Sequence, residues 1–183
     1  TDMKAAQNRL HFLHAIILAT SRAENLEDAL TKSMRLICET QDWEYGEIWM
    51  PDYDRQTLSV GNAHFIHPAD KGRLHAFWEA THAVQFPAGG GIPGRAWSTQ
   101  APSWTVDVQQ LSEFEFLRLA LAQQAGIHGV VAIPIVDKDK VLAVVVFMAQ
   151  RRLNRDEPLL DLLRTALQQI APIIRRQQLI ERL

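Results

Sequence analysis

Cysteine is nearly absent from this sequence, since Cys38 is the only one among 183 residues. A single cysteine cannot form an internal disulfide bond, a thiolate metal cluster or a two-cysteine redox couple. We therefore expect a reducing, cytoplasmic setting. Cys38 falls on the apolar face of an expected helix, which predicts a packed and inert thiol.

Long apolar runs are also missing. The longest, Val141 to Ala149, is well short of the ~20 residues that a membrane-spanning helix needs, and the first residues lack the apolar centre of a signal peptide. Direct membrane contact is therefore not expected. Both ends of the sequence have a helical rather than a polar, tail-like pattern, and we expect a piece of a longer protein.

Neither sign of charge is in large excess, because 19 basic residues face 21 acidic ones. The basic pairs at 151–152 and 175–176 are isolated and lie near acidic residues, so nucleic acid binding is not predicted. Apolar residues make up 47% and charged residues 22%, an ordinary composition for a globular domain with a sizeable core.

Signals for catalysis are lacking as well. The sequence has no G-x-S-x-G elbow, no H-E-x-x-H and no distinctive pair of carboxylates, so we do not expect an enzyme. Its seven histidines include no pair with metal-ligand spacing, and no metal site is predicted. A non-covalent haem with one axial histidine stays open, and its candidates are His64, His82 and His128.

Glycine, proline and tryptophan are concentrated in one stretch, Phe86 to Trp104. Three successive glycines followed by Pro93 predict a turn that starts a short helix. The glycines also match G-x-G-x-x-G literally, but no strand is expected just before them, so a dinucleotide-binding enzyme is the weakest alternative. The nearby aromatic residues Phe86, Trp97 and Trp104 fit either a core or the wall of an apolar pocket.

Periodicity predicts the remaining elements. A helix is expected from a cap at Asn25, and others over 68–83 and 114–125, the last ended by Gly126. Strands are expected over 45–50, 58–66 and 103–106, and then as a hairpin over 127–136 and 141–148.

Both ends carry apolar residues at alternating spacings of three and four, which is typical of a coiled-coil seam. Residues 1–20 would form an N-terminal arm, 21–150 the central domain, and 151–183 a C-terminal signalling helix that bends near Gln168 because of Pro172. The first helix could instead lie on its own domain. We predict a homodimer whose seam consists of Leu10, Leu13, Ile17, Leu163, Ala166, Ile170, Ile173 and Ile180.

A family resemblance rests on several short motifs taken together. They are Gly91-Ile92-Pro93-Gly94-Arg95-Ala96-Trp97, Ala101-Pro102, Asp107, Arg118 with Ala125-Gly126, and Ala132-Ile133-Pro134-Ile135. In this combination, and in the order of its elements from Leu26 to Met148, the sequence resembles a GAF domain.

The resemblance implies an α+β, GAF/PAS-like fold: a central antiparallel sheet of about five or six strands with helices on both sides, flanked by long terminal helices. It also implies a small-molecule sensor in a signalling protein, such as a sensor histidine kinase of a two-component system or a cyclic-dinucleotide enzyme. The alternative is a ligand-free GAF scaffold for dimerisation and domain spacing. Candidate pocket residues are His64, His82, Phe86, Trp97, Trp104, Asp107, Arg118 and His128.

Departures from the family's sequence patterns reduce the number of possible ligands. Bilin-binding members attach their chromophore through a cysteine in the region of 114–128, where this sequence has none, so covalent bilin is not expected. Cyclic-nucleotide members carry a phenylalanine where this sequence has Arg152, which argues against that ligand. Free methionine sulfoxide reductase members need more than one cysteine. The cofactor, if there is one, stays unknown.

Overall fold

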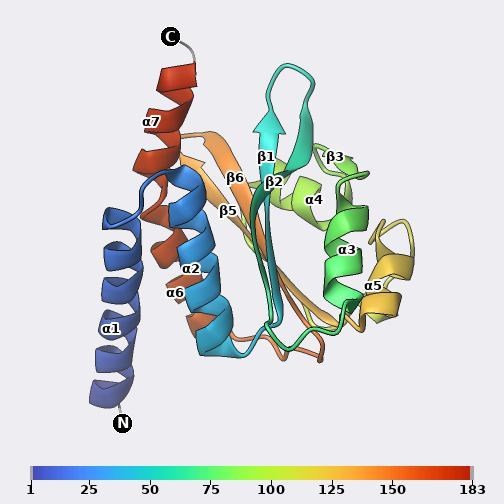
Figure 1. Ribbon diagram of the computed structural model, residues 1–183, viewed down its shortest axis with the longest axis horizontal. Helices are drawn as coiled ribbons and strands as arrows, with labels where there is room; N and C mark the ends of the chain where they lie inside the picture. Colours follow the sequence, from blue (N-terminus) through green and yellow to red (C-terminus); the bar gives the residue numbers. More distant parts are fainter. Residues whose placement is uncertain (1, 182–183) are drawn as a thin grey trace.

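The fold is a six-stranded antiparallel sheet with helices on both faces (Figure 1). In the computed structural model, which describes residues 2–181, the strand order is β3-β2-β1-β6-β5-β4. This confirms the expected α+β class. The strands are β1 (Tyr45–Asp52), β2 (Thr57–Ile66), β3 (Gln85–Pro87), β4 (Ser103–Thr105), β5 (Gly129–Asp137) and β6 (Lys140–Ala149). The helices are α1 (Asp2–Ser21), α2 (Leu26–Gln41), α3 (Arg73–Thr81), α4 (Gly91–Thr99), α5 (Leu119–Ala125), α6 (Glu157–Gln168), α7 (Ala171–Glu181) and the 3-10 turn η1 (Val108–Gln110).

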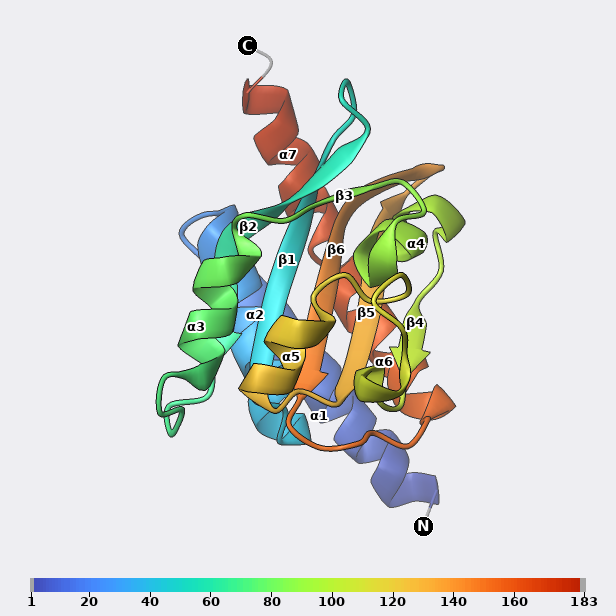
Figure 2. The same cartoon turned by 90° about the vertical axis from the view of Figure 1, so that its right-hand side faces the viewer.

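The helices divide into two layers. Helices α1, α2, α6 and α7 cover one face of the sheet, whereas α3, α4 and α5 cover the other (Figures 1 and 2). The near-continuous apolar sequences of β5 and β6 suit this arrangement, because almost every side chain in both strands is buried against one layer or the other. Among residues 2–181, no helix combines the length and apolar character needed to cross a bilayer.

Local signals in the sequence form the structures expected of them. Asn25 caps α2, where its side chain accepts a hydrogen bond from the Asp28 amide. Gly126 ends α5 in the left-handed conformation, with φ of 73°. Helix α6 stops at Gln168 and α7 begins at Ala171, so the interruption expected from Pro172 is present.

Two expectations about segments near α5 and α3 were wrong. The helix expected over 114–125 begins only at Leu119. Before it, the Ser112 amide donates to the Glu115 carboxylate and the Glu115 amide donates to the Ser112 hydroxyl, so side chains close a tight turn instead. The expectation that no strand stands just before the glycines was also wrong, since β3 ends at Pro87; its three residues are too few to show an alternating pattern.

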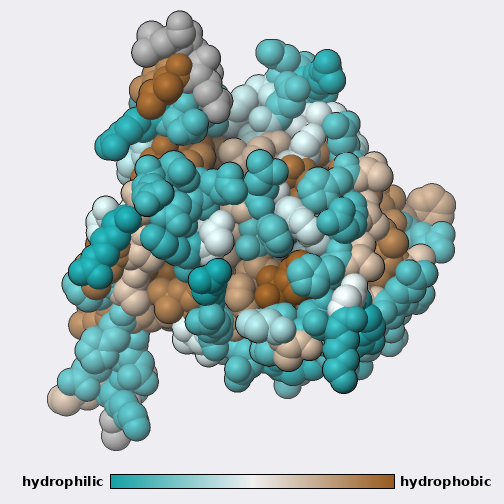
Figure 3. Space-filling model, viewed as in Figure 1, coloured by the Kyte–Doolittle hydropathy of each residue, from teal (hydrophilic) through white to brown (hydrophobic). Residues whose placement is uncertain are grey.

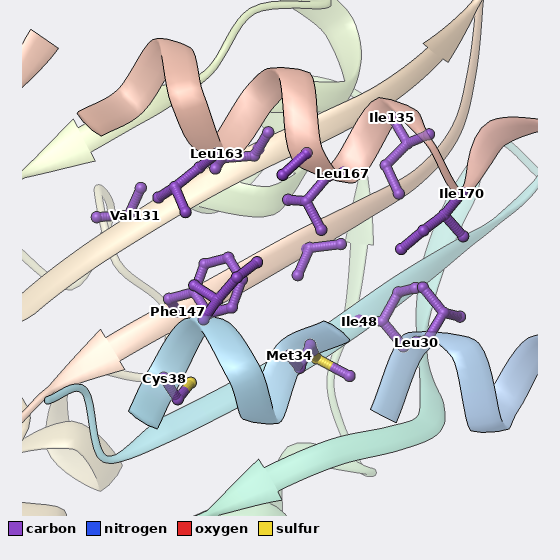
Figure 4. Close-up of a cluster of buried hydrophobic side chains, with 14 of the residues drawn as sticks. Leu30, Met34, Cys38, Ile48, Val131, Ile135, Phe147, Leu163, Leu167 and Ile170 are labelled. Carbon is purple, nitrogen blue, oxygen red and sulfur yellow. The ribbon is translucent and has the colours of Figure 1, made fainter. Parts of the chain in front are cut away.

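The terminal helices pack on the chain itself. Helix α1 lies beside α2 and α6 and buries Phe12 and Ile16, as the alternative of a helix on its own domain described. Leu163, on α6, and Ile170, between α6 and α7, are fully buried against the sheet (Figure 4), and Ala166 is buried with them. Assigning these three residues to an intermolecular seam was therefore wrong, because a helix lying on a sheet shows the same periodicity.

The other proposed seam residues lie at or near the surface. Leu10, Ile17 and Ile180 are exposed, while Leu13 and Ile173 are half-buried. Apolar surface is visible near the free end of α7 (Figure 3). The exposed positions Leu10, Ile17 and Ile180 remain available to a second chain, whereas Leu13 packs partly against the chain's own core.

The glycine stretch forms the expected turn into α4. It lies between antiparallel edge strand β3 and α4, outside any parallel strand-helix-strand unit, so the literal dinucleotide motif lacks the context it needs. Gly91 has φ of 62°, and a Cβ there would lie 2.5 Å from Cε1 of Phe86. Gly91 thus lets the loop pack directly against Phe86.

Gly91→Ala is expected to lower the free energy of unfolding by roughly 2–4 kcal/mol, through left-handed strain and the clash with Phe86. Gly72→Ala is the matched control, because Gly72 also has positive φ but an added Cβ there would have no neighbour within 4 Å. Urea unfolding of both variants measures the difference. Equal losses would show that the contact with Phe86 contributes nothing.

Candidate functional site

A charged pair is completely buried on the sheet face covered by α3, α4 and α5. Arg118 precedes α5 and its Nη1 donates to Oε1 of Glu47, on β1, over 2.8 Å. The Arg118 side chain is 1% exposed and that of Glu47 is 0% exposed. Withdrawing both charges from water costs several kcal/mol per ion, so the pair needs compensation from its surroundings.

Alternation along β1 explains how Glu47 reaches this position. Tyr45, Glu47 and Trp49 are two residues apart and point to the same face, whereas Ile48 packs in the opposite layer. Gly46 also faces that opposite layer, since a Cβ there would meet Cys38 and Met34. Strand β1 therefore places one carboxylate between two aromatic rings.

Neighbouring side chains hold the pair in place. Nη1 of Arg118 also donates to the Thr81 hydroxyl over 3.1 Å, and that hydroxyl donates to the Phe77 carbonyl over 2.7 Å. The Trp49 indole N–H donates to the second oxygen of Glu47. Both oxygens of the carboxylate and both hydrogens of Nη1 thus have partners.

Four aromatic rings surround the guanidinium group. Its Cζ lies 5.0 Å from the ring centroid of Phe77, 5.2 Å from Trp49, 5.6 Å from Phe86 and 5.7 Å from Phe116. We call these four rings the arginine cage. Each desolvated cation–π contact is worth about 1–2 kcal/mol, so the cage offsets part of the cost of burying Arg118.

Part of Arg118 has no hydrogen-bond partner. Among the described residues, no group accepts a hydrogen bond from its Nε or Nη2, although both atoms are buried. The Tyr45 hydroxyl lies beside Glu47 and Thr81 without meeting hydrogen-bond geometry. Burial, and then the charge of Glu47, raises the pKa of Tyr45 well above its ordinary value, so the hydroxyl stays neutral and can donate.

Only part of the predicted pocket lies here. Arg118 and Phe86 belong to this centre, and Trp97 is half-buried against the same apolar cluster. Sequence reasoning missed Glu47 and the other neighbours. A glutamate flanked at both i−2 and i+2 by aromatic residues, within a strand that is otherwise apolar, was the available signal. The missed residues are Tyr45, Glu47, Trp49, Phe77, Thr81 and Phe116.

His64 and His82 lie together at a second place, around Trp78. The His64 ring stacks on Trp78 at 3.9 Å between centroids, and the His82 ring meets Trp78 edge-on at 4.6 Å. Nδ1 of each histidine forms a hydrogen bond with a backbone carbonyl. Neither histidine contacts Arg118 among the described interactions, so the arrangement does not favour a haem ligand within the cage.

Asp107 and His128 form a third group, and Trp104 lies apart from all three. Nδ1 of His128 is 3.0 Å from Asp107 Oδ1, which also accepts from the Gln109 amide. Trp104 packs on the opposite sheet face against Trp43, with 6.3 Å between ring centroids, and donates to the Leu153 carbonyl. The prediction that Trp104 lines the same pocket as Arg118 was therefore wrong. Within residues 2–181, no three His, Cys, Asp or Glu side chains gather as a metal site would require.

Asp107 is expected to influence how the stability of the protein changes in acid. Burial acts to raise the pKa of Asp107, but the Gln109 amide, His128 and Arg152 together outweigh it and lower the pKa. A depressed folded-state pKa stabilises the protein above pH ~4, the unfolded value, and this stabilisation is lost as pH falls through the folded value.

Asp107→Asn should therefore reduce the drop in unfolding free energy between pH 5 and pH 3, as measured by urea unfolding. Glu113→Gln is the control, because that carboxylate is exposed and should leave the drop unchanged. An identical acid profile for Asp107→Asn and the wild type would contradict the assigned role of Asp107.

Solved structures with this fold include other proteins' GAF domains. The GAF domain of a phosphoenolpyruvate-protein phosphotransferase from Coxiella burnetii is 20% identical with a TM-score of 0.77, and the match covers 97% of this chain and 99% of that one. Free methionine-R-sulfoxide reductase from Neisseria meningitidis, solved with its substrate, is 14% identical with a TM-score of 0.69, covering 92% and 91%. At these identities the likeness shows the fold alone.

Curated proteins with similar sequences are much longer than this chain. Protein NLP3 from Oryza sativa subsp. japonica is 26% identical over 140 residues, which are 70% of this chain but 15% of that protein. Protein NLP6 from Arabidopsis thaliana is 25% identical over 63% of this chain and 15% of its own length. The family model for the GAF domain matches residues 23–175, which is most of the sequence. The chain therefore belongs to the GAF domain family.

Proposed function

We propose that this chain is the small-molecule-sensing module of a longer signal-transduction protein. The observation that supports it is the buried Glu47–Arg118 pair, in which Nε and Nη2 of Arg118 have no partner inside the arginine cage. A core built for stability alone gains nothing from an unsatisfied buried donor, which costs about 1–3 kcal/mol. A ligand that accepts those hydrogen bonds would remove the cost.

In this proposal a ligand reaches the site when the turn over 112–117 moves aside. Phe114 is 94% exposed and Leu117 is 55% exposed, so only Phe116 ties the turn to the core. Segments with few buried contacts open at low free energy. Moving this turn would uncover Arg118 without disturbing the sheet.

Strand β1 offers a route from the site to the terminal helices. Glu47 faces the layer of α3, α4 and α5, while the next residue, Ile48, packs in the layer of α2, α6 and α7 (Figure 4). A shift of Glu47 would therefore move a residue under those helices. In this proposal the helices transmit the change caused by ligand binding to an output domain. A sensor kinase as the output domain stays a prediction. The curated proteins with similar sequences are not named as kinases.

A ligand screen tests the proposal. The melting temperature is measured against small anions, cations and neutral compounds, and a binder should raise it saturably. Thr81→Val should weaken that rise, because it removes the hydroxyl that orients Arg118, whereas Thr165→Val, on the exposed face of α6, should not. A screen in which no compound stabilises the protein would count against sensing.

A ligand-free scaffold is the second candidate. Phe77, Phe86 and Phe116 are buried and fill the space around Arg118, which favours it. The filling groups are thus mainly phenylalanines rather than Trp97 and Trp104. A scaffold predicts no ligand response in the same screen, with self-association unaffected.

We also propose that the domain forms a homodimer through α1. Met3, Leu10 and Ile17 are 75%, 66% and 45% exposed and follow one another at intervals of one heptad. Such a stripe would bury its apolar side chains against α1 of a second copy. Native mass spectrometry across a dilution series should show a dimer that dissociates on dilution; monomer at all concentrations would contradict this.

A further inference from the structure

We infer that the site takes a ligand carrying a carboxylate group, which Arg118 binds through its Nε and Nη2 edge. This inference rests on the proposed sensing function and names its ligand class. A guanidinium group has five N–H donors. Glu47 and Thr81 use Nη1, and no described group accepts from Nε or Nη2.

The free atoms have a specific geometry. Nε–H and one Nη2–H point in parallel along one edge of the planar group, and this pair matches the two coplanar oxygens of a carboxylate. Arg118 is held in place by Glu47 and by the four rings of the cage. The edge is therefore preorganised, and little side-chain entropy remains to be lost on binding.

Charge narrows the class of ligand that the site can bind. Arg118 already occupies the cage, so a cationic ligand would meet a like charge inside aromatic walls. A phosphate dianion would add two negative charges near Glu47 in a site closed to water. A carboxylate adds only one negative charge beside that of Glu47.

Glu47 is a positioning residue in this scheme. Its two oxygens are engaged by Arg118 and by the Trp49 indole, so it fixes which edge of the guanidinium remains free. The side chains around the guanidinium group as a whole are aromatic, which suits an apolar or aromatic remainder of the ligand.

Nitrogen-15 NMR of the arginine Nε–H groups tests the inference on the intact domain. Acetate and benzoate are titrated in, each against its neutral amide, acetamide or benzamide. Arg118→Lys identifies the Arg118 signal by its loss. We expect that signal to shift saturably with at least one carboxylate and to stay still with the matching amide.

Affinity supplies a second readout. Arg118→Lys keeps the positive charge but loses the paired edge, and should weaken binding of the same carboxylate at least tenfold, while Arg95→Lys, on the exposed side of α4, should not. Should Arg118→Lys fail to fold, the Arg118 signal is assigned through its contacts with Trp49 in the wild type, and the titration decides alone.

An Arg118 signal that ignores both carboxylates, or that moves equally with acid and amide, would overturn the carboxylate assignment. The sensing proposal fails separately, when no compound of any charge raises the melting temperature. A neutral or cationic compound that stabilises the wild type, with both carboxylates inert, would support sensing and refute the carboxylate.

Discussion

Arg118→Met should lower the free energy of unfolding by about 3–5 kcal/mol, because it leaves the Glu47 carboxylate buried without its cation. Methionine fills much of the same volume, so a cavity contributes little to that loss. Of the two side-chain hydrogen bonds that Glu47 accepts, only the one from the Trp49 indole would remain. Urea unfolding at pH 7 measures the change, and Arg95→Met, at an exposed site on α4, should stay within about 0.5 kcal/mol of wild type.

A double variant separates the charge from the shape. Glu47→Gln with Arg118→Met removes both charges, and it should recover part of the stability that Arg118→Met loses. Additive losses, with no recovery, would mean that the two side chains do not interact across 2.8 Å as the structure has them.

Ile170→Glu should have a comparable or larger effect, of about 4 kcal/mol or more. Ile170 is fully buried between the helices and the sheet, where a carboxylate would find no partner and the apolar contacts would be lost (Figure 4). We expect the variant to be largely unfolded at 25 °C, as circular dichroism would show, rather than folded and monomeric.

Leu10→Glu is the matched control for that variant. Leu10 lies on the exposed stripe of α1, so the same chemical change should leave the stability within about 0.5 kcal/mol and weaken self-association instead. A folded Ile170→Glu protein that had lost only its dimer would contradict the buried placement and support a seam through Ile170.

Much of the fold could be predicted because its signals are local. The Asn25 cap, the Gly126 cap and the apolar hairpin strands each depend on a few neighbouring residues, and each has the expected form. The failures were equally local in origin. The turn at 112–117 is closed by Ser112 and Glu115, a pairing that a helix start shows as well.

The terminal helices show a limit of periodicity. A four-three alternation is the signature of a helix with one apolar side, and it does not say whether that side meets another chain or the same one. Leu163 and Ile170 meet their own sheet, whereas Leu10 and Ile17, which the same pattern assigned to the seam, lie on the exposed stripe of α1.

The site was the hardest part to predict, because its residues come from distant segments. Glu47 and Arg118 are 71 positions apart, and only the sheet and α5 bring them together. Trp104 was misplaced because a strand residue can face either layer, and the three residues of β4 gave no pattern to decide between them.

A crystal structure with a bound stabilising compound would show whether the caged Arg118 is the ligand site proposed for this GAF domain. We expect a ligand carboxylate that accepts hydrogen bonds from Nε and Nη2 of Arg118, with the turn over 112–117 displaced to admit it. A ligand bound elsewhere, with Arg118 still enclosed by its four rings, would contradict the proposal.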